Sequence, residues 1–143
     1  MTPLYTATAT SEGGRAGRVK SDDATLDFQL TVPKGLGGPG GAGTNPEQLF
    51  AVGYAACFAN ALRSAARKLR KDDAVDGATV TAEVDIGRVE GGRFGLAVRL
   101  DATIPKAGQA DAEELMALAH DRCPYSNATR GNIDVELSVR GGA

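Results

Sequence analysis

The sequence contains few of the residues that mark specialised classes of protein. Among its 143 residues there are two cysteines, one histidine and no tryptophan, and the formal net charge is -2. So few cysteines argue against a secreted scaffold stapled by disulfides. The charge balance provides no basic surface, so we expect no nucleic-acid partner.

Long apolar runs and targeting segments are also missing. No apolar run reaches the roughly 18 residues of a membrane span. The first residues, MTPLYTATATSEGG, lack the basic and apolar regions of a signal peptide. We therefore expect a cytoplasmic protein without a membrane partner. In that reducing compartment, a pair of cysteines is more often redox-active or simply buried than structural.

Three familiar site motifs are absent or incomplete. The glycine-rich segment 34–44, KGLGGPGGAGT, lacks the GxxxxGK[ST] pattern of a phosphate-binding loop, so we interpret it as a connection, with residues 35–43 as a candidate lid. The cysteines do not form a C-x-x-C redox motif. Together with His120 they leave a zinc site one ligand short, although a carboxylate could complete it.

Residues 44–71, TNPEQLFAVGYAACFANALRSAARKLRK, predict one long central helix. Asn45 is a suitable N-cap, Pro46 suits the first helical position, and Glu47 lies in the first turn, where the helix dipole favours a carboxylate. No charged side chain occurs between residues 49 and 62, so several sides of the helix should be buried. One chain of this length covers such a helix poorly, and we therefore expect a homodimer.

Alternation of apolar and polar residues predicts the strands. They are expected at residues 4–10, 18–21, 26–32, 80–86, 94–104 and 133–139. A second helix should run from Asp111, in a capping box with Glu114, to about Arg122, and be followed by irregular chain. The order β-β-β-α-β-β-α-β predicts an α+β fold in which a curved antiparallel sheet wraps on the long buried helix. We expect a single domain over residues 1–143.

The two cysteines lie in different surroundings. Cys57 occupies the middle of the apolar helix, where a buried thiol is usually inert. Cys123 follows the end of the second helix and precedes a proline, an irregular position that suits an exchanging thiol. His120, three residues before Cys123, is interpreted either as its base or as a surface or cap histidine.

Two motifs together resemble a known family. TNPEQLFAVGYAACF and AHDRCPYSNATRGN are similar to the organic hydroperoxide resistance proteins, a branch of the superfamily that includes osmotically inducible protein C. LYTATATSEGGRAGR and NIDVELSV extend the resemblance over nearly the whole chain. The resemblance implies a thiol-dependent peroxidase, an obligate homodimer that reduces organic hydroperoxides to alcohols. It also implies no bound cofactor and recycling by an external dithiol, notably the lipoyl group of a lipoylated protein.

The resemblance also assigns residue roles. Cys57 would be the peroxidatic cysteine and Cys123 the resolving one, with Arg15 and Glu47 as the catalytic arginine and glutamate, and with Arg18 as the alternative arginine. Ten residues of helix separate Glu47 from Cys57 by about 15 Å. Either the helix is broken between them or the two residues meet across subunits. We expect the second, an intertwined dimer with its active sites at the interface.

The apolar residues near Cys57 favour an alkyl or lipid-derived peroxide over hydrogen peroxide. The predicted substrate-binding residues are Leu49, Phe50, Tyr54 and Phe58. Two alternatives stay open: a peroxidase of the osmotically inducible protein C type, or a non-catalytic dimer that binds an apolar ligand and has redox-sensing cysteines.

Overall fold

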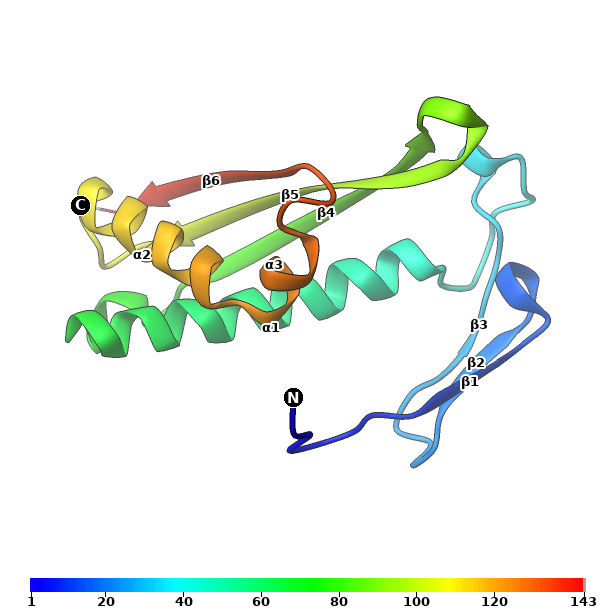
Figure 1. Ribbon diagram of the computed structural model, residues 1–143, viewed down its shortest axis with the longest axis horizontal. Helices are drawn as coiled ribbons and strands as arrows, with labels where there is room; N and C mark the ends of the chain where they lie inside the picture. The colour runs from blue at the N-terminus through cyan, green and yellow to red at the C-terminus, as the bar shows by residue number, and fades with distance from the viewer. Residues whose placement is uncertain (143) are drawn as a thin grey trace. The chain divides into compact units, whose positions relative to one another are not determined.

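The computed structural model describes residues 1–142, which form an α+β fold divided into two compact units, Met1–Leu49 and Phe50–Ala143 (Figure 1). Each unit has its own three-stranded sheet. The α+β class expected from the strand and helix patterns is confirmed. A single domain over residues 1–143 stays a prediction.

The first unit contains an antiparallel sheet of β1 (Ala9–Glu12), β2 (Arg18–Ser21) and β3 (Asp27–Gln29). The predicted strand at residues 4–10 is wrong at its start, because β1 pairs with β2 only from Ala9 onward. The third strand is also shorter than the predicted 26–32. It is extended by a single bridge between Leu30 and Thr44.

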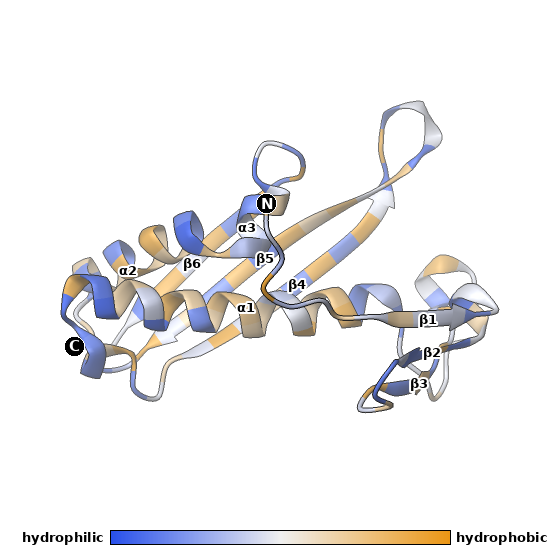
Figure 2. Cartoon of the chain, turned by 60° about the horizontal axis from the view of Figure 1, so that its bottom comes forward, coloured by the Kyte–Doolittle hydropathy of each residue, from blue (hydrophilic) through white to orange (hydrophobic). Residues whose placement is uncertain are grey.

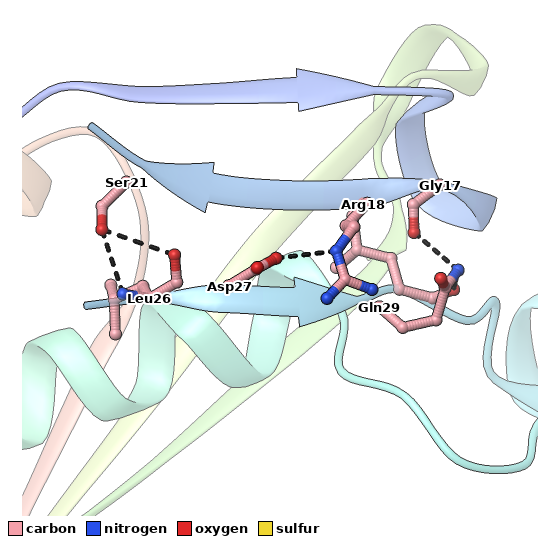
Figure 3. A network of polar contacts seen from close by, with 7 residues as sticks. Gly17, Arg18, Ser21, Leu26, Asp27 and Gln29 are labelled. Atoms are coloured by element: carbon pink, nitrogen blue, oxygen red, sulfur yellow. Dashed lines mark hydrogen bonds and ion pairs between the residues drawn. The ribbon is translucent and has the colours of Figure 1, made fainter. Parts of the chain in front are cut away.

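Side chains fasten the second and third strands together (Figure 3). The Arg18 guanidinium donates from Nε to Asp27 Oδ1 at 2.7 Å, and Gln29 Nε2 donates to the carbonyl of Gly17 at 2.7 Å. At the other end of the pair, the backbone N–H of Leu26 donates to the Ser21 hydroxyl at 3.0 Å. These bonds anchor the hairpin whose neighbouring turn carries Arg15.

The turn that presents Arg15 depends on glycine. A 3₁₀ turn at Gly14–Ala16 connects β1 to β2, and a Cβ atom on Gly17 would lie only 1.8 Å from the carbonyl oxygen of Glu12. Only glycine permits this close approach. The sequence therefore fixes a tight bend with the arginine at its tip.

Helix α1 (Pro46–Leu69) begins as predicted, because the Asn45 side chain accepts the backbone N–H of Gln48 at 2.8 Å. The helix is buried on one side rather than all round. Its buried residues are Tyr54, Phe58, Ala61, Leu62, Ala65 and Ala66. Val52 on the opposite side is 70% exposed. By length and composition α1 meets the criterion for a membrane span, but core helices meet it too.

The second unit contains β4 (Thr79–Arg88), β5 (Phe94–Ile104) and β6 (Val135–Gly141). The first two form the predicted antiparallel hairpin, whereas β6 runs parallel to β5, so the expectation of an antiparallel sheet is wrong there. The reason is the connection: α2 (Gln109–Arg122) and α3 (Pro124–Thr129) carry the chain back before β6 begins. Figure 2 shows the hydropathy alternating along β4 and β5.

The helices after β5 differ from the predicted ones at two points. Helix α2 starts at Gln109 with Gly108 as N-cap, so Asp111 and Glu114 do not form the expected capping box. Both carboxylates instead accept hydrogen bonds from Lys71 Nζ, at 2.9 and 2.8 Å. Helix α3 replaces the expected irregular chain, because the proline after Cys123 takes the first helical position.

One apolar core fills the second unit. Side chains of α1 and α2 pack on one face of the sheet, against Val98, Leu100, Ala102 and Ile104 of β5. Cys123 belongs to this core, and Cys57 packs against it while partly exposed. The core therefore holds the backbones of both cysteines on well-packed elements.

Candidate active site

The two cysteines, far apart in sequence, are adjacent in the second unit. Cys57 lies on α1 and is partly exposed, whereas Cys123 lies at the junction of α2 and α3 and is fully buried. The Cys123 thiol donates to the Cys57 sulfur at 3.5 Å. A disulfide requires about 2.05 Å between the sulfur atoms, so a modest approach would join them. An exposed thiol beside a buried one suits a reaction in which the first meets a substrate and the second follows.

The second unit by itself does not activate Cys57. Burial raises the pKa of the Cys57 thiol, the backbone N–H of Tyr125 partly opposes this, and the neighbouring Cys123 raises it further. A reactive thiolate at neutral pH therefore requires a positive charge from elsewhere.

The first unit holds a preformed cationic group. Arg15 donates from Nη1 and Nη2 to the two carboxylate oxygens of Glu47, at 2.8 and 2.6 Å. The hydrogen bonds from Arg15 lower the pKa of Glu47, so the carboxylate is ionised at neutral pH. Arg18, the alternative arginine, pairs with Asp27 instead. Arg15 is thus the arginine that a glutamate orients.

Helix α1 settles one of the two geometric alternatives. It runs without interruption from Pro46 to Leu69, so the helix is not broken between Glu47 and Cys57. Ten residues of intact helix rise by about 15 Å.

An apolar cavity of about 580 Å³ lies in the second unit. Its lining residues are Phe50, Leu96, Tyr125, Ala128, Thr129, Asn132 and Ile133. The ring centroids of Phe50 and Tyr125 are 6.2 Å apart, and each ring also packs against Tyr54. Apolar walls with few polar groups are typical of sites for small apolar ligands.

The predicted substrate-binding residues separate into two groups. Phe50 lines the cavity and Leu49 is partly buried. Tyr54 and Phe58 have no exposed surface, so direct contact with a ligand does not fit their positions on the core side of α1. Sequence reasoning missed Tyr125, whose ring lines the cavity. Its signal was its place two residues after Cys123.

A close approach fixes Tyr125 against α1. A Cβ atom on Gly53 would lie 2.9 Å from the Tyr125 hydroxyl oxygen, so the glycine makes room for the phenol one helical turn before Cys57. The cavity wall and the reactive helix are therefore in direct contact.

The remaining candidate residues have other places. His120 Nδ1 lies 2.9 Å from the Ser126 hydroxyl, which makes it a partner of α3 rather than a base on Cys123. Within residues 1–142, no group of three or more histidine, cysteine, aspartate or glutamate side chains is arranged to hold a metal ion. The role of residues 35–43 as a lid stays a prediction.

Comparison with known proteins places these features in a family context. A family model described as OsmC-like protein matches residues 38–138. The organic hydroperoxide resistance protein of Xanthomonas axonopodis pv. citri is 51% identical over 138 residues, covering 95% of this chain and 94% of that protein. A crystal structure of an organic hydroperoxide resistance protein from Elizabethkingia anophelis has a TM-score of 0.91 and 50% identity, covering 99% of each chain. OhrB of Bacillus subtilis gives a TM-score of 0.87 at 42% identity, covering 96% of this chain and 100% of that one.

Proposed function

The chain belongs to the organic hydroperoxide resistance proteins of the OsmC-like family, and on this premise we propose that it is a thiol-dependent peroxidase. Its reaction would convert an organic hydroperoxide to the corresponding alcohol. The observation that carries the proposal is the hydrogen bond at 3.5 Å between a buried Cys123 thiol and a partly exposed Cys57 sulfur. Two thiols so arranged can give up two electrons to an oxidant by forming a disulfide.

The first step is attack of the Cys57 thiolate on the outer oxygen of the peroxide. The O–O bond breaks, Cys57 becomes a sulfenic acid, and the departing alkoxide takes a proton to leave as the alcohol. Arg15, whose guanidinium is held by two hydrogen bonds to the Glu47 carboxylate, supplies the positive charge that the Cys57 site lacks.

Arginine acts mainly on the departing oxygen. Lowering a thiol pKa from about 8.5 by about three units raises the thiolate fraction at pH 7 about 30-fold. Intrinsic nucleophilicity then falls about 20-fold for a Brønsted coefficient near 0.45, so the two effects nearly cancel. Stabilisation of the developing alkoxide by the Arg15 guanidinium is therefore the larger contribution.

The second and third steps regenerate the enzyme. The Cys123 sulfur attacks the Cys57 sulfenic acid, the S–O bond breaks, and water leaves as the disulfide forms. An external dithiol then reduces the disulfide and becomes oxidised itself. A lipoyl group on a lipoylated protein is the proposed reductant, and no bound cofactor is needed. The cytoplasm is the proposed location.

We propose that each site is completed by a second copy of the chain. Intact helix separates Glu47 from Cys57 by about 15 Å, so the clamp of Arg15 and Glu47 would serve Cys57 of the other copy. The exposed Val52 side chain on the uncovered side of α1 is consistent with such a dimer, because an isolated chain would leave it in water.

Mixing two inactive variants tests this arrangement. Cys57→Ser and Arg15→Ala are each expected to be inactive, but a mixed dimer would contain one site with both native residues if sites form across subunits. Unfolding and refolding the two together should restore activity. No recovery in a mixture shown to contain mixed dimers would refute the shared site.

The cavity supports an organic substrate. Its wall includes the aromatic rings of Phe50 and Tyr125, which would contact an alkyl group. Hydrogen peroxide has no alkyl group to contact these apolar side chains, so alkyl or lipid-derived hydroperoxides should react faster.

Turnover separates this proposal from the non-catalytic alternative, whether a redox sensor or an apolar-ligand binder. Catalytic amounts of protein would receive excess cumene hydroperoxide with dihydrolipoamide or glutathione, with Cys57→Ser as control. The proposal predicts many turnovers with dihydrolipoamide, few with glutathione, and none in the variant. A redox sensor would oxidise once and stop, and an apolar-ligand binder would leave both thiols intact.

A further inference from the structure

A buried hydrogen-bond network lies beside the cysteine pair and is used by none of the steps above. The Tyr54 hydroxyl lies 2.9 Å from Ser126 Oγ and 3.0 Å from Thr129 Oγ1, and His120 Nδ1 lies 2.9 Å from Ser126 Oγ. Tyr54 and Ser126 have no exposed surface, and Thr129 is 5% exposed. The network joins all three helices, α1, α2 and α3.

The protons of this network can be assigned in one way. Thr129 Oγ1 donates to the backbone carbonyl of Ser126 at 3.2 Å, which uses its only proton. Tyr54 must then donate to Thr129, Ser126 must donate to Tyr54, and His120 must donate from Nδ1 to Ser126. The result is a directed chain in which every hydroxyl donates once. Such chains strengthen each of their members.

This directed chain surrounds Cys123. His120 lies three residues before Cys123 and Ser126 three residues after it, so their hydrogen bond closes a loop around the cysteine. Cys123 is the residue where α2 ends and α3 begins, and its own backbone N–H and C=O are bonded to Ala119 and Asn127. The angle between the two helices at this junction determines where the Cys123 sulfur lies.

The same chain is tied to the other cysteine. Tyr54 precedes Cys57 by three residues on α1, about one helical turn. One buried network therefore holds the backbones of both cysteines, whose sulfur atoms are 3.5 Å apart.

We propose that Tyr54, Ser126 and His120 are positioning residues that hold Cys123 against Cys57 and thereby set the rate of disulfide formation. The inference rests on the proposed peroxidase function. In the step concerned, the Cys123 sulfur forms a bond to the Cys57 sulfenic sulfur. Hydroxide leaves that sulfur and, with the Cys123 proton, departs as water. Among residues 1–142 no hydrogen bond joins the network to either sulfur, and the network takes no part in the electron balance.

The test separates the two chemical steps in one experiment. Reduced protein would be mixed with cumene hydroperoxide, and peroxide loss and disulfide formation would be followed separately by quenching and mass spectrometry. Ser126→Ala and Tyr54→Phe are expected to consume the first equivalent of peroxide within about twofold of the parent rate. Disulfide formation should slow at least about tenfold. Interrupting the chain of hydrogen bonds leaves buried hydroxyls unpaired, and the helices that carry the two cysteines would shift to pair them again. Excess peroxide should then convert more Cys57 to sulfinic acid.

Three further variants exclude a merely structural effect. His120→Asn keeps a donor near the Nδ1 position and should retain the parent rate of disulfide formation, whereas His120→Leu should slow it. Ser64→Ala is the matched control, because Ser64 accepts a hydrogen bond from Arg122 between α1 and α2 outside the network. It should leave both steps unchanged. Equal slowing of both steps in the network variants, or normal disulfide formation in them, would overturn the inference.

A second readout works without peroxide. Equilibration with oxidised and reduced glutathione measures the effective concentration of the Cys57–Cys123 pair. The network variants should lower it at least about tenfold relative to the parent and to Ser64→Ala, and an unchanged value would contradict the inference. If the parent protein itself does not react with peroxide, the proposed function fails, yet this measurement still decides the positioning role.

Discussion

Glu47 orients Arg15, so Glu47→Gln should slow peroxide reduction with little loss of stability. The carboxylate accepts two hydrogen bonds, at 2.8 and 2.6 Å, from the two terminal nitrogens of Arg15. Glutamine keeps one acceptor oxygen and turns an amide NH₂ toward the guanidinium, so one bond is lost and the group can rotate. A misplacement of about 1 Å at a reacting centre can cost about 100-fold in rate. We therefore expect the rate of peroxide reduction by Cys57 to fall about 10- to 100-fold.

The expected stability change is small. Arg15 is 37% exposed, and a pair at such a site contributes up to about 1 kcal/mol, or about 3 °C in Tm. Asp27→Asn is the matched control, because it removes the same type of pair from Arg18 in the same unit. Stopped-flow measurement of hydroperoxide consumption and calorimetry would be made on both variants. A full rate in Glu47→Gln, or an equal loss in Asp27→Asn, would refute the reasoning.

Three further predictions concern pH, substrate and assembly. Arg15 holds the pKa of Glu47 below its usual value, so the stabilisation by this pair is complete above about pH 4.5 and is lost as pH falls through the lowered pKa; carboxyl ¹³C shifts should titrate accordingly. Phe50→Ala should slow cumene hydroperoxide about tenfold more than hydrogen peroxide, whereas the exposed Phe94→Ala should change neither rate. If the proposed dimer forms, Val52→Asp should convert it to monomer in sedimentation experiments and abolish turnover, and a fully active monomer would contradict the shared site.

Local sequence signals predicted the elements with strong periodicity. The start of α1 followed from Asn45 and Pro46. The hairpin of β4 and β5 followed from the alternation of apolar and polar residues over 80–86 and 94–104. Helix α3 was missed because six residues make fewer than two helical turns, too short for a recurring apolar pattern. The proline after Cys123 was also interpreted as a stop rather than as a first helical residue. The parallel direction of β6 had a signal in the long helical connection after β5.

The site was less accessible to sequence reasoning. Arg15 and Glu47 are 32 positions apart, and no periodicity joins them, so their pairing rested on family resemblance. Tyr54 was expected to touch substrate because it lies among apolar residues near Cys57. A buried tyrosine hydroxyl needs a partner, however, and its partners, Ser126 and Thr129, lie more than 70 positions away. Only the tertiary fold brings such residues together.

Thiol counting after one equivalent of peroxide tests the central claim most directly. Fully reduced protein would be mixed with one equivalent of cumene hydroperoxide, quenched and denatured, with hydrogen peroxide and Cys57→Ser in parallel. The account predicts rapid loss of both Cys57 and Cys123 thiols with the organic peroxide, slower loss with hydrogen peroxide, and no loss of the Cys123 thiol in the variant. Persistence of both thiols in the parent protein over minutes would contradict it.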